Sequence, residues 1–155
     1  MKRAAYNLLL DWKGKSGRKP LIIQGARQVG KTWLMREFGK KEFGQTAYFN
    51  FEINKALHSI FKSGFDTGKI ISSLNIVAGF KIEPSNTLII LDEIQACPEA
   101  ITALKYFQEN SPEYNIFAAG SLLGVAIHGG VSFPVGKVDF LTVYPLDFPE
   151  FLDLY

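Results

Sequence analysis

Eight consecutive residues, Gly25 to Thr32, match the pattern G-x-x-x-x-G-K-[ST] at every fixed position. Glycines let the backbone curl so that successive amide N–H groups point at phosphate oxygens, and a helix that starts there adds its positive dipole. Lys31 can then reach the β- and γ-phosphates, and the Thr32 hydroxyl can bind Mg²⁺. The segment therefore predicts a nucleoside triphosphate site. The alternative is a glycine turn before a surface helix that carries an ordinary lysine.

The predicted nucleotide contacts cover this whole loop and the residue after it. They are Gly25, Ala26, Arg27, Gln28, Val29, Gly30, Lys31, Thr32 and Trp33. Arg27 and Gln28 have two readings, contact with phosphate or contact with a neighbouring subunit. Trp33 is also explained by burial in the core or under covered surface.

Two acidic residues, Asp92 and Glu93, directly follow the apolar run from Leu88 to Leu91. A buried strand places the residues that follow it at the carboxyl edge of the sheet, where the phosphate loop also lies. We expect Asp92 to hold Mg²⁺, mostly through water, because this ion keeps part of its hydration shell. We expect Glu93 to orient or deprotonate the water that attacks the γ-phosphate, which makes it a catalytic candidate together with Lys31. The alternative for both acids is a helix cap after a strand.

A third candidate catalytic residue, Ser121, ends the segment that begins at Ala118. At that strand end a polar side chain would lie between the acids and the γ-phosphate and sense whether the phosphate is present. The alternative is a serine in a Gly-Ser turn. Gln95 has two equal alternatives, contact with the phosphate site or with backbone.

The nucleotide is expected to be ATP. The β-rich segment from Thr46 to Phe51 lies between the phosphate-loop strand and the acidic strand, and an acid directly follows the metal-binding Asp92. This arrangement fits ATPases better than kinases or GTPases. The guanine signature Asn-Lys-x-Asp is missing, since the run from Asn54 to Leu57 lacks the acid.

These residues must be positioned by strands that alternate with helices. Together with the phosphate loop, that alternation predicts an α/β fold, a three-layer P-loop NTPase sandwich with a mostly parallel central sheet of about five strands. Strands are predicted over 20–24, 46–51, 87–91, 114–119 and 138–144, and helices over 2–13, 31–40, 55–62, 66–78 and 97–110.

Size and composition are those of one globular domain spanning residues 1–155. A chain of this length, with 47% hydrophobic residues, can bury a core without disulfides or structural metals. Cys97 is the single cysteine, so no internal disulfide can form. His58 and His128 have no third ligand near them in the sequence, which argues against a metal site built on histidine. No apolar run has the length of a signal peptide or of a membrane span, so we expect a cytoplasmic protein with no membrane contact.

Charge is distributed unevenly along the chain. Residues 1–41 carry eleven Lys or Arg against two acids, and the remainder carries six Lys against thirteen acids. Such a basic segment can hold phosphates of a nucleotide or of nucleic acid. The alternative is that its members only solvate turns and helix ends, as expected for Lys13, Lys15, Arg18, Lys19, Lys40 and Lys41.

Four blocks of sequence together resemble a family of AAA-type P-loop ATPases of bacteria and archaea. The blocks are the loop from Gly25 to Thr32, Leu91-Asp92-Glu93-Ile94-Gln95, Ala119-Gly120-Ser121, and the segment 138–152 with its ending Pro-Leu-x-Phe-x-Glu-Phe-Leu. The last block is the most diagnostic, and the resemblance covers essentially the whole chain. Longer members of this family carry a C-terminal domain of unknown function. The resemblance implies that this chain is the N-terminal ATPase domain, truncated before a lid and that C-terminal domain.

One departure from the family bears on catalysis. Every arginine lies at or before Arg36, and Gly136-Lys137 stands where family members often have Gly-Arg. Lysine lacks the planar fork with which arginine grips a phosphoryl group. An arginine finger from this chain's later half is therefore missing, and such a group is worth about 10³-fold or more in rate.

The leading hypothesis is an ATP-binding, Mg²⁺-dependent switch with weak hydrolysis, in which nucleotide closes a lid on a protein partner or on the C-terminal domain. The runner-up is a nucleic-acid-associated ATPase motor, suggested by the basic N-terminal segment. A small-molecule phosphotransferase is the third class, and it would need an acceptor pocket and a basic lid that the sequence does not display.

Overall fold

The fold was analysed in a computed structural model that describes residues 3–25, 30–120 and 136–143. Ala26 to Val29, Ser121 and most of the block ending at Leu152 lie outside the described residues. In chain order the elements are α1 (Arg3–Gly14), β1 (Leu21–Gln24), α2 (Lys31–Glu42), β2 (Gln45–Asn50), α3 (Ala56–Lys62), α4 (Thr67–Ala78), β3 (Thr87–Asp92), a 3₁₀ turn η1 (Ile94–Ala96), α5 (Pro98–Asn110), β4 (Asn115–Gly120) and β5 (Asp139–Thr142).

The five strands form one sheet in the order β2-β3-β4-β1-β5, and all four neighbouring pairs are parallel. Parallel pairing brings the carboxyl ends of β1 and β3 to the same edge of the sheet, on either side of β4. The loop that begins at Gly25 and the acids at Asp92 and Glu93 therefore lie at one edge. The predicted α/β fold with a parallel five-stranded sheet is confirmed.

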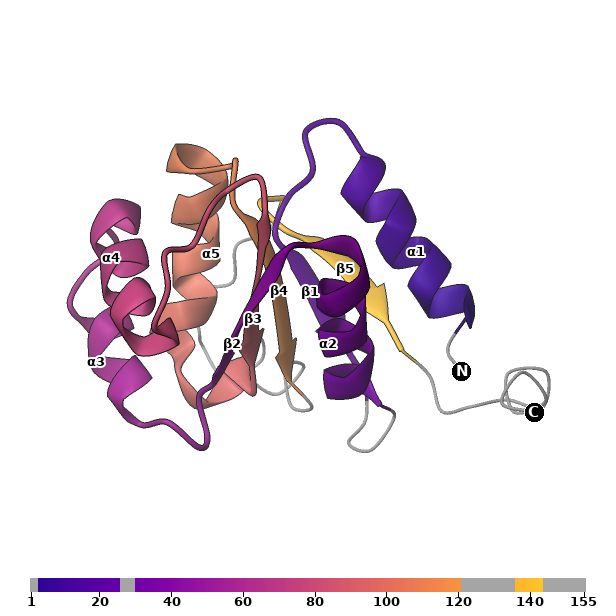
Figure 1. Cartoon of the computed structure of the whole chain (residues 1–155). Helices are drawn as coiled ribbons and strands as arrows, with labels where there is room; N and C mark the ends of the chain where they lie inside the picture. Colours follow the sequence, from indigo (N-terminus) through magenta and orange to yellow (C-terminus); the bar gives the residue numbers. More distant parts are fainter. Residues whose placement is uncertain (1–2, 26–29, 121–135, 144–155) are drawn as a thin grey trace.

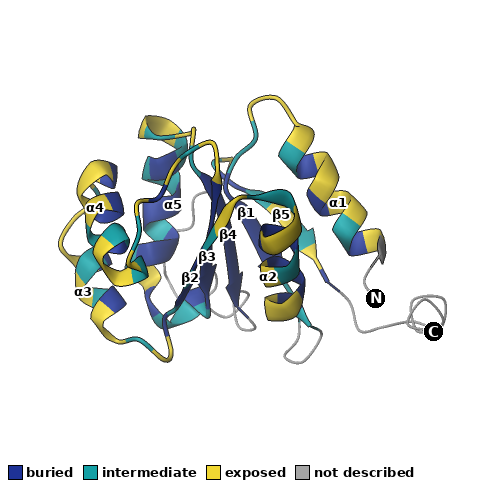
Figure 2. Ribbon diagram, in the orientation of Figure 1, coloured by how far each residue is buried: buried dark blue, intermediate teal, exposed yellow. Residues whose placement is uncertain are grey.

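Helices cover both faces of the sheet, with α3, α4 and α5 on one side and α1 and α2 on the other (Figure 1). Adjacent strand residues enter opposite cores, as alternation along a strand requires. In β3, Ile89 and Leu91 belong to the core under α3, α4 and α5, whereas Leu88 and Ile90 belong to the core under α1 and α2. Because both faces are covered, the central strands are buried throughout (Figure 2).

Each predicted helix and strand is present, with bounds that differ by a few residues. The clearest difference is the 3₁₀ turn η1, which lies between the two acids and α5 and is not predicted from the sequence. The last strand ends at Thr142 rather than at Tyr144, which lies outside the described residues. Among the helices of the described part of the chain, none combines the length and apolarity needed to cross a membrane.

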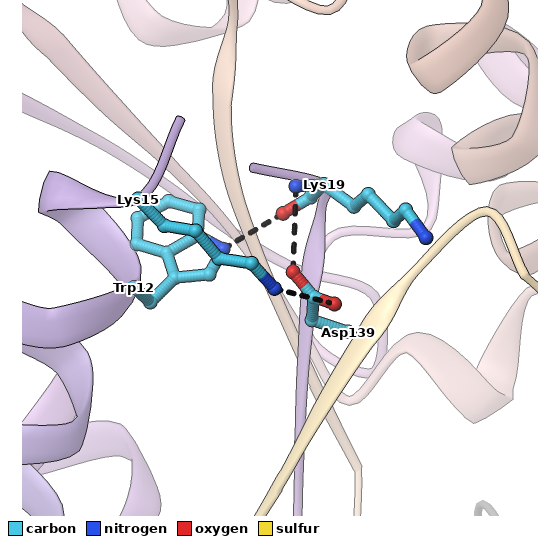
Figure 3. Close-up of polar contacts among 4 residues, drawn as sticks. All are labelled: Trp12, Lys15, Lys19 and Asp139. Carbon is cyan, nitrogen blue, oxygen red and sulfur yellow. Dashed lines mark hydrogen bonds and ion pairs between the residues drawn. The ribbon is translucent and has the colours of Figure 1, made fainter. Parts of the chain in front are cut away.

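Polar contacts tie α1 to the start of β5 (Figure 3). The Trp12 indole donates to the carbonyl of Lys19 at 2.8 Å, and the Lys19 amide donates to Asp139 at 3.4 Å. The Lys15 ammonium lies 3.7 Å from the other oxygen of the same carboxylate. Two of the basic residues in the N-terminal segment therefore contribute to the fold, Lys15 through its side chain and Lys19 through its backbone.

Three more basic side chains of this segment have partners within the protein. Lys13 donates to the carbonyl of Glu42 at 2.8 Å, and Lys41 pairs with Glu37 at 3.4 Å. Arg18 donates to the Asn115 side chain and lies over the Trp12 ring. These contacts favour a structural role for much of the basic segment.

Candidate functional site

The site is built where the loop after β1 turns into α2. Gly30 has φ 83° and ψ 23°, a left-handed conformation that glycine adopts without the steric cost of a Cβ. Its carbonyl accepts from the Leu34 amide at 2.9 Å, so the helix begins directly after it. The glycine at the fixed position of the motif is thus the residue that lets a strand–loop–helix connection turn into α2.

Lys31, the first residue of α2, is only 9% exposed. Its ammonium donates to the carbonyl of Gly25 at 2.8 Å, so the lysine side chain extends back to the start of the loop. A buried ammonium is favourable only where hydrogen-bond acceptors surround it. The lysine is therefore held against the loop rather than directed into solvent.

Asp92, the last residue of β3, is 3% exposed and accepts three hydrogen bonds from described residues. The hydroxyls of Thr32 and Tyr48 both donate to Oδ2 at 2.6 Å, and the Glu93 amide donates to Oδ1 at 2.9 Å. Thr32 is exposed, so it lies between the buried carboxylate and solvent. Thr32 and Asp92, the two residues predicted to hold the metal, come from different motifs and are in direct contact.

Tyr48 lies in the middle of β2, and the sequence reading did not select it. Burial and the hydrogen bond to Asp92 raise the pKa of Tyr48 to about 12, so the phenol stays protonated and acts as a donor. The Arg36 guanidinium lies over its ring, 4.3 Å from the centroid, and the Asn50 amide donates to its hydroxyl at 3.3 Å. A tyrosine in the β-rich segment from Thr46 to Phe51 carries no sequence signal that distinguishes it from a core tyrosine.

Glu93 has φ 53° and ψ 44°, and it is the only residue other than glycine with positive φ in the described part of the chain. Such a conformation costs of order 1–3 kcal/mol and occurs preferentially at functional sites. It starts the tight turn of η1, in which the Ala96 amide donates to the Glu93 carbonyl at 3.1 Å.

The side chain of Glu93 is contacted from the same turn. The Gln95 amide nitrogen donates to Glu93 Oε1 at 3.3 Å, while the buried Gln95 side-chain oxygen has no hydrogen-bond partner among the described residues. Gln95 thus contacts a candidate catalytic acid through its side chain.

The side chains around Asp92 provide the kind of ligands that Mg²⁺ prefers. The ion prefers oxygen ligands, keeps several waters, and is usually bound through one or two carboxylates plus substrate phosphates. Thr32 and Asp92 supply a hydroxyl and a carboxylate. Donors from the described residues fill three of the carboxylate's about four lone-pair positions, which leaves one for a metal-bound water. In the part of the chain that the structure describes, no three His, Cys, Asp or Glu side chains lie close enough together to hold a metal ion by themselves. The residues fit Mg²⁺.

The predicted site residues that the structure describes lie at one edge of the sheet, and Trp33 is more exposed than expected. Gly25, Gly30, Lys31, Thr32, Asp92 and Glu93 lie at the carboxyl edge of the sheet. Trp33 is 46% exposed, so its assignment to the core is wrong. It lines a pocket of about 370 Å³ together with Arg36, Lys40 and Tyr48.

Comparisons with known proteins agree with this geometry. The family model described as an AAA domain matches residues 17–152. Among curated proteins, none matches the chain. A Walker-type ATPase of Pyrococcus abyssi superposes with a TM-score of 0.63 at 17% identity, over 99% of this chain and 56% of that one.

Two further structures show the same fold. DnaA from Aquifex aeolicus, bound to AMPPCP, has a TM-score of 0.55 at 18% identity, over 98% of this chain and 48% of its own. Drosophila ORC bound to DNA has a TM-score of 0.62 at 17% identity, over 99% of this chain and 45% of its own. The chain thus spans about half the length of these proteins. With a family match over most of its length, the chain belongs to the AAA domain family, a family of P-loop ATPase domains.

Proposed function

We propose that this AAA domain binds ATP with Mg²⁺ and acts as a nucleotide switch in a longer protein, with slow hydrolysis on its own. The observation that carries the proposal is the 2.6 Å contact between Thr32 Oγ1 and Asp92 Oδ2, next to the buried Lys31. The contact joins the two motifs, which are 60 positions apart in sequence, into one oxygen-rich site. The chain itself would be the N-terminal ATPase domain of that longer protein.

Each side chain of the site has a distinct task. Lys31 would exchange its contact with the Gly25 carbonyl for the β- and γ-phosphates, while Thr32 and Asp92 would hold Mg²⁺. When bound, the ion supplies neutralisation of charge on the phosphate oxygens. Glu93 would accept a proton from the water whose oxygen attacks the γ-phosphorus. The bond from that phosphorus to the bridging oxygen breaks, and ADP and phosphate leave.

The position of Lys137, the last Lys or Arg in the sequence, supports slow turnover. Lys137 precedes β5, and β5 runs parallel to β1 with Asp139 beside Leu21 at the start of that strand. Lys137 is therefore near the amino edge of the sheet, whereas the phosphate loop follows the carboxyl edge. Its ammonium pairs with Glu109 at 3.4 Å. Within one copy of the chain, Lys137 cannot replace a missing arginine at the γ-phosphate.

We expect phosphate release by the 155-residue chain to be slower than release by a longer form that includes the following segments. If those segments supply an arginine, the difference should approach about 10³-fold. Both forms should be compared at equal concentration and saturating Mg²⁺ and ATP. Rapid hydrolysis by the short chain would refute this part of the proposal.

The substitution Asp92→Asn is expected to remove most of the effect of Mg²⁺ on ATP binding. The carboxamide keeps the shape of the side chain but loses the negative charge that attracts the hydrated ion, and residues that contact a metal through water typically contribute about 10- to 100-fold to metal affinity. ATP binding should be titrated over Mg²⁺ concentration by calorimetry. Asp139→Asn, which changes a carboxylate at the start of β5, is the matched control and should leave the Mg²⁺ dependence unchanged.

The nucleic-acid alternative has less support. Some structures of the same fold are of proteins bound to DNA, but at 17–18% identity they support a shared fold only. In this chain Lys13, Lys15, Arg18 and Lys41 have intramolecular partners. Basic side chains that pair within the fold are less available to bind phosphates, so the switch is the better-supported function.

A further inference from the structure

A second hydroxyl reaches the metal-site carboxylate from the edge strand of the sheet. Tyr48 OH lies 2.6 Å from Asp92 Oδ2, the same oxygen that accepts from Thr32. Tyr48 belongs to β2, which pairs with β3 in a register that places it beside Ile90, two residues before Asp92. The contact is therefore set by strand pairing and does not depend on the phosphate loop.

The ring of Tyr48 is itself held in place from two directions. The Arg36 guanidinium stacks over it at 4.3 Å, and the Asn50 amide donates to its hydroxyl at 3.3 Å. Arg36 belongs to α2, and Gly39 lets this helix lie close to β2, since a methyl group at that position would overlap the Thr46 side chain. Because Arg36 and Asn50 hold Tyr48 in place, its hydroxyl in turn restricts the position of the Asp92 carboxylate.

Hydrogen-bond capacity determines what this constraint does. A carboxylate oxygen has about two lone-pair positions, so Thr32 and Tyr48 together fill those of Oδ2. The Glu93 amide fills one position on Oδ1. Among residues 3–25, 30–120 and 136–143 no donor fills the other, which is the position available to a metal-bound water. Removing the tyrosine donor would leave the carboxylate held only by Thr32 and the Glu93 amide and would open a second, competing position for water.

We infer that Tyr48 is a positioning residue for Mg²⁺: its hydroxyl fixes the Asp92 carboxylate so that one oxygen faces the hydrated ion. The inference rests on the proposed function and goes beyond it by naming a residue outside both nucleotide motifs. Groups that orient metal ligands in this way typically contribute about 10- to 100-fold to metal affinity. Because Thr32 and the Glu93 amide still hold Asp92, we place Tyr48 at the lower end of that range.

The substitution Tyr48→Phe tests the inference, since it removes the hydroxyl and leaves the ring under Arg36. We expect the Mg²⁺ concentration at half-maximal ATP binding to rise about 10-fold, while ATP binding in excess chelator stays within about 2-fold of wild type. Calorimetry over a Mg²⁺ series at fixed ATP measures both. Tyr6→Phe is the matched control. Tyr6 lies on α1, and it also donates to a carboxylate, that of Glu42, at 2.7 Å.

A second variant keeps the test usable if Tyr48→Phe does not fold. Arg36→Ala retains the hydroxyl and removes the cation above the ring, and it should raise the same Mg²⁺ midpoint by about 2- to 5-fold, the size of an exposed cation–π contact. An unchanged midpoint in both variants, with a normal wild-type response, would overturn the inference and leave the proposed function standing. An equal loss of binding with and without Mg²⁺ would show a merely structural role and would also overturn it. Wild-type protein that binds no ATP would overturn both.

Discussion

The substitution Lys31→Ala is expected to weaken ATP binding by at least about 30-fold. Lys31 is buried and its ammonium is held at the start of the loop, so its loss leaves phosphate charge without the cation that faces it. Truncating one partner of a buried, hydrogen-bonded charge pair costs about 2–5 kcal/mol, and each 1.4 kcal/mol is a factor of ten. Calorimetric titration with ATP in the presence of Mg²⁺ measures the change directly.

Lys41→Ala is the matched control for that experiment. Lys41 lies near the end of the same helix, and its exposed ion pair with Glu37 contributes little, as surface pairs generally do. The control should bind ATP like wild type. If Lys31→Ala also bound ATP with unchanged affinity while remaining folded, the phosphate loop would not be the nucleotide site.

Of the substitutions proposed, Phe117→Ala is expected to cause the largest loss of stability. Phe117 is fully buried in β4, at the centre of the sheet, and its ring contacts Trp12 of α1 and Phe38 of α2 at centroid distances of 5.1 and 5.6 Å. Replacing a buried Phe by Ala costs about 3–5 kcal/mol because the cavity closes only in part. Thermal unfolding should show a Tm lower by about 6–20 °C for a domain of this size.

Phe140→Ala provides the comparison on the same sheet. Phe140 lies in β5 and is 47% exposed, so its truncation should cost no more than about 1.5 kcal/mol. Similar losses for the two variants would mean that α1 and α2 do not pack on β4 as described.

The sequence was sufficient for the layers of the fold because hydrophobic periodicity and turn residues are local properties. Continuous apolar runs such as Leu88 to Leu91 predict strands covered on both faces, and both faces of β3 are buried. The phosphate loop was predictable for a different reason, since its chemistry requires glycines and a lysine at fixed spacing.

The order of the strands and the contacts between them could not be predicted in this way. Tyr48 is one of several aromatic residues in a strand-forming segment, and nothing in its neighbours distinguishes it from a core tyrosine. Its contact with Asp92 depends on the register that pairs Asn50 with Asp92, a long-range property. The left-handed backbone of Glu93 likewise depends on the tight turn into α5, whereas a glutamate between a strand and a helix gives no sign of it.

The most direct test is one calorimetric titration series of the wild-type chain with ATP, ADP and GTP, each with and without Mg²⁺. If amide groups, Lys31 and the Thr32–Asp92 pair form a polyphosphate and metal site, ATP will bind and Mg²⁺ will strengthen that binding. Weaker binding of GTP would separately support the preference for ATP. Absence of ATP binding in the presence of Mg²⁺, or ATP binding that Mg²⁺ does not change, would contradict it.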